Sequence, residues 1–177
     1  MPATRDDLLQ RLESLGIATT TVEHPPLFTV EESQALRGQI PGGHTKNLFL
    51  KCKKGNLWLV VALETATINL KTLHKRIGSG RLSFGSADLL EATLGVPAGS
   101  VTPFSLINDT DTKVSVVLDQ DMMQQEQLNF HPLENTATTT IEARNLLAFV
   151  WACGHEPQIL HVSEETLAAP DQAPGAT

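Results

Sequence analysis

The chain has 177 residues, which is enough for one domain with a substantial core and too few for two ordinary domains. A hydrophobic fraction of 41% and a charged fraction of 19% are typical of a soluble globular protein, and no apolar run approaches the roughly 20 residues that a membrane helix needs. The N-terminus lacks an apolar signal core, and Cys52 and Cys153 form no C-x-x-C pair. We therefore expect a cytoplasmic protein with reduced cysteines, without a disulfide framework or a zinc site.

The net charge of −7 is distributed unevenly along the chain. Up to Phe84 there are 11 Lys and Arg residues against 7 Asp and Glu residues, and from Gly85 onward there are 2 against 13. The basic residues of the first half cluster in two groups, which are Lys46, Lys51, Lys53 and Lys54, then Lys71, Lys75, Arg76 and Arg81. An acidic protein with one basic face can still bind an anionic partner such as nucleic acid. Solvated lysines on a hairpin and a helix would produce the same pattern.

The first elements follow from periodicity. Leucines at helical spacing predict an amphipathic helix over residues 5–15, and β-branched residues predict a short strand over residues 17–23. A capping-box pattern begins a second helix, at residues 29–37, and residues 38–43 form a loop.

A hairpin and two helices are predicted next. Apolar runs at residues 46–52 and 57–63 are joined by a Lys-Lys-Gly-Asn turn, which is typical of a β-hairpin. Asn69 and Ser86 are candidate caps for two short helices that each end at a glycine, over residues 70–77 and 86–94.

The second half of the chain alternates short elements. Residues 106–108 and 113–118 bracket an Asp-Thr-Asp-Thr turn and predict a second hairpin. The remaining elements are one helical turn, two short strands and a final helix, at residues 120–125, 128–131, 138–141 and 142–152.

Hairpins interleaved with helices, without a regular βαβ rhythm, predict an α+β fold with a mixed, mostly antiparallel sheet and flanking helices. After about Val162 the content of Ala, Pro and Gly rises and periodicity is lost. We expect a single folded domain over residues 1–162 and a disordered tail over residues 163–177.

Three segments far apart in the sequence are candidates for one polar pocket. Lys46 begins a strand-like run and could hold an anionic group, although lysine at a strand end also discourages unwanted strand pairing. Asn47 would point to the opposite face of an ideal strand, so both side chains reach one pocket only if the loop breaks the alternation. His131 precedes a proline in a loop, where its imidazole either serves the pocket or lies at the surface. Residues 99–103 form a Gly-x-x-x-Pro segment that suits a turn with backbone amides close to a ligand.

Neither a metal site nor a protein nucleophile is predicted. The remaining histidines, His24, His44, His74, His155 and His161, lack the mutual spacing of metal ligands. No Gly-x-Ser-x-Gly elbow is present, and neither cysteine has a recognisable catalytic signature. An enzyme built on this sequence would therefore use no covalent protein nucleophile, and we expect no cofactor.

Five segments carry a family resemblance, and they lie at residues 45–50, 57–62, 81–84, 99–104 and 129–133. In this order, Thr-Lys-Asn-Leu-Phe-Leu, Leu-Trp-Leu-Val-Val-Ala, Arg-Leu-Ser-Phe, Gly-Ser-Val-Thr-Pro-Phe and Asn-Phe-His-Pro-Leu resemble the YbaK/prolyl-tRNA synthetase insertion-domain family of aminoacyl-tRNA editing deacylases. The likeness is greatest to its free-standing ProXp-ala or PrdX-like branch, and it extends from about residue 5 to residue 162.

The resemblance implies an aminoacyl-tRNA hydrolase that acts in trans on mischarged tRNA for proline, chiefly alanyl-tRNA. A proline pocket cannot exclude the smaller alanine strongly enough by binding, so a second site must hydrolyse the error. The resemblance assigns Lys46 to the terminal phosphate or ribose of the tRNA, His131 to the substrate at the pocket wall, and Asn47 to its orientation. Backbone groups around the ester would come from Gly99, Ser100, Val101, Thr102 and Pro103. A water positioned with help from the terminal adenosine's hydroxyl would attack the ester.

The implied partner is the acceptor end of tRNA for proline, with prolyl-tRNA synthetase or an elongation factor as transient partners. Candidates for contacts to the tRNA backbone, which would make activity sensitive to salt, are Lys51, Lys53, Lys54, Lys71, Lys75 and Arg76. We expect a monomer that does not associate with membranes.

Other readings remain open. The substrate could carry cysteine, serine or another small residue, or the protein could be a non-catalytic adaptor that binds tRNA or a synthetase. A nucleic-acid-binding regulator is a further alternative, but no helix-turn-helix pattern with a basic recognition helix is present.

Overall fold

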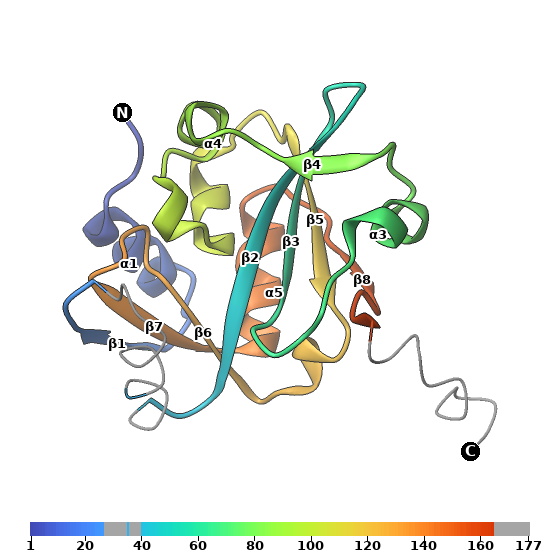
Figure 1. Ribbon diagram of the computed structural model, residues 1–177. Helices are drawn as coiled ribbons and strands as arrows, with labels where there is room; N and C mark the ends of the chain where they lie inside the picture. Colours follow the sequence, from blue (N-terminus) through green and yellow to red (C-terminus); the bar gives the residue numbers. More distant parts are fainter. Residues whose placement is uncertain (27–34, 36–39, 165–177) are drawn as a thin grey trace, which may run out of the picture.

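The structure, a computed structural model, describes residues 1–26, 35 and 40–164 (Figure 1). The strands are β1 (Thr19–Glu23), β2 (Gly43–Cys52), β3 (Leu57–Leu63), β4 (Leu82–Phe84), β5 (Val114–Asp119), β6 (Gln127–Phe130), β7 (Ala137–Glu142) and β8 (Gln158–Leu160). The α-helices are α1 (Arg5–Ser14), α3 (Leu70–Ile77), α4 (Ala87–Leu94) and α5 (Ala143–Ala152). Short 3₁₀ helices are η1 (Ala98–Ser100), η2 (Pro103–Asn108) and η3 (Met122–Gln124).

The strands form one mixed sheet in the order β1-β7-β6-β2-β3-β5-β8, and β4 pairs with β2 outside this path. The β2–β3, β2–β4, β1–β7 and β6–β7 pairs are antiparallel, whereas β2–β6, β3–β5 and β5–β8 are parallel. The predicted α+β class with a mixed sheet is confirmed.

The helix boundaries agree with the caps expected from the sequence. Asn69 Oδ1 accepts a hydrogen bond from the Lys71 amide at 3.0 Å, and Ser86 Oγ accepts one from the Leu89 amide at 3.1 Å. Gly78 ends α3 with a φ of 72°, a left-handed conformation that costs glycine little. Local sequence signals therefore set the ends of these two helices.

The sheet separates two apolar cores. The larger core joins one face of the sheet to α1, α4, η2 and α5, and α5 lies behind the strands in Figure 1. Leu146 and Phe149 of α5 and Phe104 of η2 are completely buried there. The smaller core joins the other face to α3 through Leu73 and Ile77. Because both faces are covered, β3 is an almost continuous run of buried residues.

The predicted second hairpin is wrong. Residues 103–108 form η2, and β5 pairs in parallel with β3. Pro103 stands in the first turn of η2, the Thr102 hydroxyl caps the amide of Phe104 at 3.3 Å, and the Asn108 side chain donates to the Leu94 carbonyl at 2.9 Å. These contacts favour a compact turn. The alternating pattern that predicted a strand at residues 106–108 spans only three residues and could not reveal them.

Two of the sequence predictions lie outside the described part of the chain. The helix expected at residues 29–37 falls almost entirely there, as does the tail beyond Glu164. Within the described residues, no helix is both long and apolar enough to cross a membrane.

Candidate active site

A stretch of β2 has an open edge. Strand β3 occupies one edge of β2 from Thr45 to Lys51. On the other edge, β6 pairs only with Gly43 and His44, and β4 pairs only with residues 50–52. Just after β4, the amide of Gly85 also donates to the carbonyl of Phe49 at 3.0 Å. Among the described residues, no strand pairs with that edge over residues 45–48. A ligand lying there could reach both faces of the strand and its backbone groups.

Lys46 and Asn47 lie on this open stretch and point to opposite faces. Their register with Ala62 and Val61 is regular, so the alternation of the strand is unbroken. The Lys46 ammonium donates to the carbonyl of Ala66 on the α3 side of the sheet. Asn47 Oδ1 is buried without a hydrogen-bond partner among the described residues. The two side chains can therefore reach one ligand only across the open edge.

The tertiary structure brings the Gly-x-x-x-Pro segment beside the loop that carries His131. The ring of Phe104 contacts that of Phe130 edge-on, with 5.7 Å between centroids. A Cβ added at Gly99 would lie 3.6 Å from the side-chain amide nitrogen of Asn135. The same loop adjoins the open edge of β2, because the Thr45 hydroxyl donates to the carbonyl of Asn129 at 2.7 Å.

Only part of the Gly-x-x-x-Pro segment is accessible. Gly99 is exposed and Val101 is partly buried, whereas Ser100, Thr102 and Pro103 are buried. The carbonyl of Thr102 accepts a bond from the Ser105 hydroxyl at 2.5 Å. The buried residues therefore shape the turn, and the groups able to meet a ligand are those of Gly99 and Val101.

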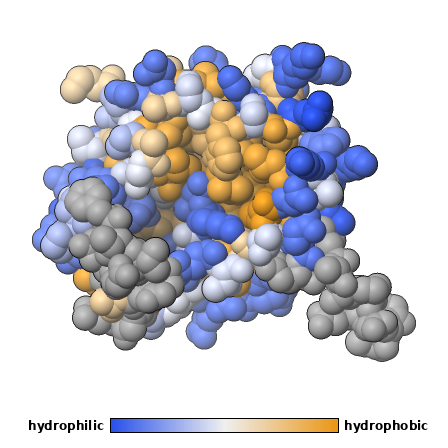
Figure 2. Space-filling model, viewed as in Figure 1, coloured by the Kyte–Doolittle hydropathy of each residue, from blue (hydrophilic) through white to orange (hydrophobic). Residues whose placement is uncertain are grey.

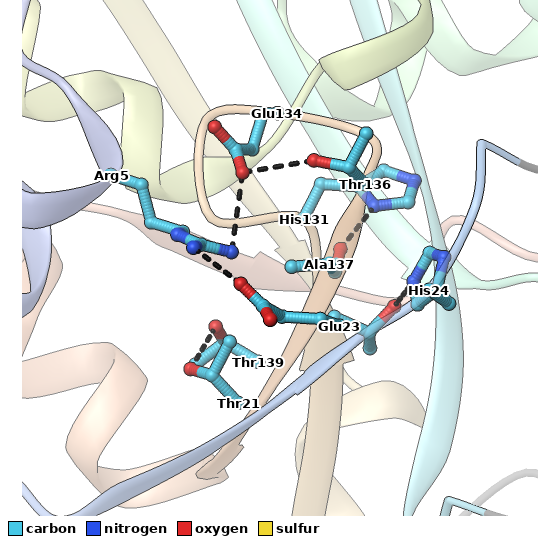
Figure 3. Close-up of polar contacts among 10 residues, drawn as sticks. Arg5, Thr21, Glu23, His24, His131, Glu134, Thr136, Ala137 and Thr139 are labelled. Carbon is cyan, nitrogen blue, oxygen red and sulfur yellow. Dashed lines mark hydrogen bonds and ion pairs between the residues drawn. The ribbon is translucent and has the colours of Figure 1, made fainter.

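Arg5 holds the loop that follows His131 (Figure 3). Its guanidinium contacts Glu23 of β1 at 2.7 Å and Glu134 of the loop at 3.2 Å, and Glu134 also accepts the Thr136 hydroxyl at 2.9 Å. Leu133 has a φ of 70° and is buried in the larger core. A non-glycine residue in the left-handed region persists only when its surroundings hold it, so the loop is tightly constrained.

His131 lies in a partly buried polar environment beside His24. Its Nδ1 lies 3.1 Å from the carbonyl of Ala137, and the two imidazole centroids are 6.5 Å apart. His24 is itself held by the Thr138 hydroxyl at 2.8 Å and the Pro25 carbonyl at 2.9 Å. Burial lowers the pKa of His131 below its ordinary value of 6.5, the Ala137 contact opposes this, and His24 adds to the lowering. His131 is thus neutral near pH 7.

Stability should decrease on acidification because of His131. The unfolded chain takes up a proton near pH 6.5, whereas the folded protein resists protonation of this ring, so stability is full above that pH and falls as the pH drops below it. We expect His131→Gln to show a smaller loss of Tm than the wild type between about pH 7.5 and about pH 5. Calorimetry of both proteins measures the difference. Equal losses in the two proteins would contradict the assignment.

Arg5→Ala should reduce turnover while leaving the fold intact. The side chain of Glu23 is 75% exposed, so the ion pairs contribute at most about 1 kcal/mol to stability. Loss of the Glu134 contact would let the loop with His131 move. If His131 contacts the substrate, as the family resemblance implies, its misplacement should lower the rate by up to about 100-fold. Single-turnover rates of Arg5→Ala and of Arg11→Ala, which removes the same charge from α1, test the positioning role of Arg5. A similar rate for the two variants would exclude the positioning role.

A basic groove lies at the far end of β2. It has a volume of about 590 Å³ and is lined by Lys51, Cys52, Lys53, Gly55, Arg81, Leu82 and Ser83. Two of the predicted tRNA-backbone residues therefore share one hollow with Arg81. Lys71, Lys75 and Arg76 are exposed on α3, which packs beside β4, and Lys54 is exposed at the hairpin turn.

Sequence reasoning missed several residues of this region. Asn135 was given no role, His24 was considered only as a metal ligand, and Arg81 was counted in the basic cluster but not assigned to tRNA. The spacing of His24 and His131 along the chain carries no signal, because a β1–β7 pairing brings them together. Within the described residues, no cluster of His, Cys, Asp and Glu could hold a metal ion.

Comparisons with known proteins define the class. Residues 24–149 match the model of the aminoacyl-tRNA editing domain. The chain is 43% identical over 162 residues to the mouse prolyl-tRNA synthetase associated domain-containing protein 1, covering 89% of this chain and 95% of that protein. It is 37% identical over 149 residues to the prolyl-tRNA editing protein ProX of Acetoanaerobium sticklandii, covering 84% of this chain and 91% of that protein.

The fold agrees with this result. A crystal structure described as a candidate trans-editing enzyme for prolyl-tRNA synthetase superposes with a TM-score of 0.70 at 20% identity, covering 93% of this chain and 99% of that one. The chain therefore belongs to the aminoacyl-tRNA editing domain family.

Proposed function

We propose that the protein is a trans-acting deacylase that hydrolyses mischarged tRNA for proline, with alanyl-tRNA as its chief substrate. The observation that supports the proposal is an open edge of β2 that carries Lys46 and Asn47, next to the strand that leads to His131 and to the Gly99–Pro103 segment packed against it, in a chain of the editing family. The similarity to a prolyl-tRNA editing protein favours tRNA for proline.

The tautomer of His131 suits an aminoacyl substrate. The Ala137 carbonyl can only accept a hydrogen bond, so Nδ1 of the neutral ring carries the proton and Nε2 is left as an acceptor. An aminoacyl ester carries an ammonium group on its α-carbon, which is a donor. In this proposal Nε2 receives that group, and Asn47 Oδ1 supplies a second acceptor from the strand edge.

The ester is cleaved without a covalent protein intermediate. Backbone groups of Gly99 and Val101 lie beside the ester, and a water held by the hydroxyl of the terminal adenosine attacks its carbonyl carbon. The alcohol of the tRNA leaves, and the free amino acid carries the new carboxylate. Lys46 holds the terminal phosphate, which its mobile point charge can do without a fixed geometry.

Deacylation assays test the proposal. Transfer RNA for proline is charged separately with alanine, cysteine, serine or proline and incubated with the purified protein. We expect rapid loss of alanine and little loss of proline. Preference for cysteine or serine would retain the mechanism and change the substrate. If none of the esters is hydrolysed, the protein is instead an adaptor that binds tRNA or a synthetase.

A further inference from the structure

An exposed apolar surface lies beside the open edge of β2, on the face that carries Lys46. Figure 2 shows apolar side chains gathered over β2 and β4, bordered by hydrophilic ones. Partly buried apolar residues packed on the smaller core form this surface, and they are Leu48, Ala66, Ile68, Leu70 and Leu82. Phe84, two residues after Leu82 on β4, adds a phenyl ring to this surface and is 61% exposed. Leaving a phenylalanine in water forgoes the free energy of its burial, so this ring is a candidate contact for a partner.

The register places Phe84 on the same face as Lys46. Phe84 lies opposite Leu50 in the antiparallel β2–β4 pair, and paired residues project to the same side. Lys46, Leu48 and Leu50 alternate along β2 and share that side. Leu50 is four positions after Lys46, which is about 13 Å along a strand.

Cations bracket the aromatic ring. Lys46 lies at one end of the surface. At the other end Leu82, two residues before Phe84, also lines the basic groove that holds Lys53 and Arg81, whereas Lys51 of that groove pairs with Ser83 and so projects from the opposite face of the sheet. Alternating cationic groups and an exposed aromatic ring are the features with which proteins bind single-stranded nucleic acid, through phosphate contacts and base stacking.

We propose that Phe84 stacks on a base of the unpaired 3′ end of the tRNA, between the terminal phosphate at Lys46 and the acceptor stem at the basic groove. This proposal rests on the proposed function, since it assigns the same substrate. It gives Phe84 a role in binding and none in the chemical step.

The test compares wild-type protein with Phe84→Ala, Phe84→Trp and Trp151→Ala. Trp151 is a matched control, because it is 54% exposed on α5, which packs on the opposite face of the sheet. The probe is a minihelix of the acceptor stem of tRNA for proline, with or without its unpaired 3′ nucleotides. Anisotropy gives Kd for the uncharged minihelix, and steady-state hydrolysis of the alanyl form gives kcat and KM. Thermal melts establish that each variant folds.

We expect Phe84→Ala to raise Kd and KM about tenfold with kcat nearly unchanged, and Phe84→Trp to bind like the wild type. Removing the unpaired nucleotides should abolish the difference between wild type and Phe84→Ala. In a Trp151→Phe background, the fluorescence that Phe84→Trp adds to that of Trp58 should be quenched when the minihelix binds, and the Trp151→Phe protein alone serves as the reference.

Equal Kd values for wild type and Phe84→Ala, or an equal loss in Trp151→Ala, would overturn the stacking. A Phe84→Ala protein that binds the minihelix normally but loses affinity for purified prolyl-tRNA synthetase would show that the surface docks a protein instead. Failure of the proposed function can be told apart from failure of the stacking. A wild-type protein that binds the alanyl minihelix without hydrolysing it would overturn the proposed function, and the Kd values of wild type and Phe84→Ala could still be compared.

Discussion

Lys46→Ala should reduce deacylation by about 100-fold, because in the proposed function Lys46 holds the terminal phosphate and so positions the ester, and a misplaced substrate can cost about that much in rate. Lys46 is the charged residue of the open β2 edge, and among the described residues its ammonium is held only by the carbonyl of Ala66. A phosphate can replace that carbonyl as the acceptor, because a lysine ammonium donates in several directions. Single-turnover hydrolysis of alanyl-tRNA for proline measures the loss.

Two further variants serve as controls for this result. Lys113→Ala removes an exposed lysine next to β5 and should leave the rate unchanged. Lys46→Arg keeps the charge with a different shape and should recover part of the activity. The Lys46→Ala protein should melt close to the wild-type temperature. A folded Lys46→Ala variant with near-wild-type turnover would remove Lys46 from the mechanism.

His155→Ala should destabilise the protein more than any other single change considered above. His155 Nε2 lies 2.9 Å from Asp109 Oδ2, and both residues are almost completely buried. The Asp109 carboxylate also accepts the amides of Lys113 at 3.0 Å and Val114 at 2.9 Å, so it ties the turn before β5 to the end of α5. Removal of the imidazole leaves a buried carboxylate short of one donor and creates a cavity, at a cost of about 2–4 kcal/mol.

Such a loss corresponds to a decrease in Tm of roughly 10 °C in a chain of this size. Calorimetry beside His161→Ala provides the comparison, because His161 contacts Asp121 at 3.4 Å in a pair whose side chains are 37% and 41% exposed. We expect the exposed pair to contribute at most about 1 kcal/mol. Similar melting temperatures for His155→Ala and the wild type would mean that Asp109 needs no third donor.

Most local structure could be predicted because its causes are local. The β2–β3 hairpin follows from two apolar runs and their turn, and α3 and α4 follow from caps and terminal glycines. Strands β4 and β8 escaped prediction because three residues carry no measurable periodicity. The turn at residues 103–108 was mistaken for a strand because its contacts, such as that of Asn108 with Leu94, are long-range.

The sequence by itself determined the apolar runs of the β2–β3 hairpin, the caps and the segments that carry the family resemblance, because side-chain spacing and short motifs are properties of the linear chain. Only the tertiary structure decided that Lys46 and Asn47 lie on opposite faces of an open strand edge, that Arg5 restrains the loop with His131, and that Phe84 is exposed close to the basic groove. These features depend on which strands pair, and in what register. Strand pairing joins residues distant in sequence, so local patterns cannot specify it.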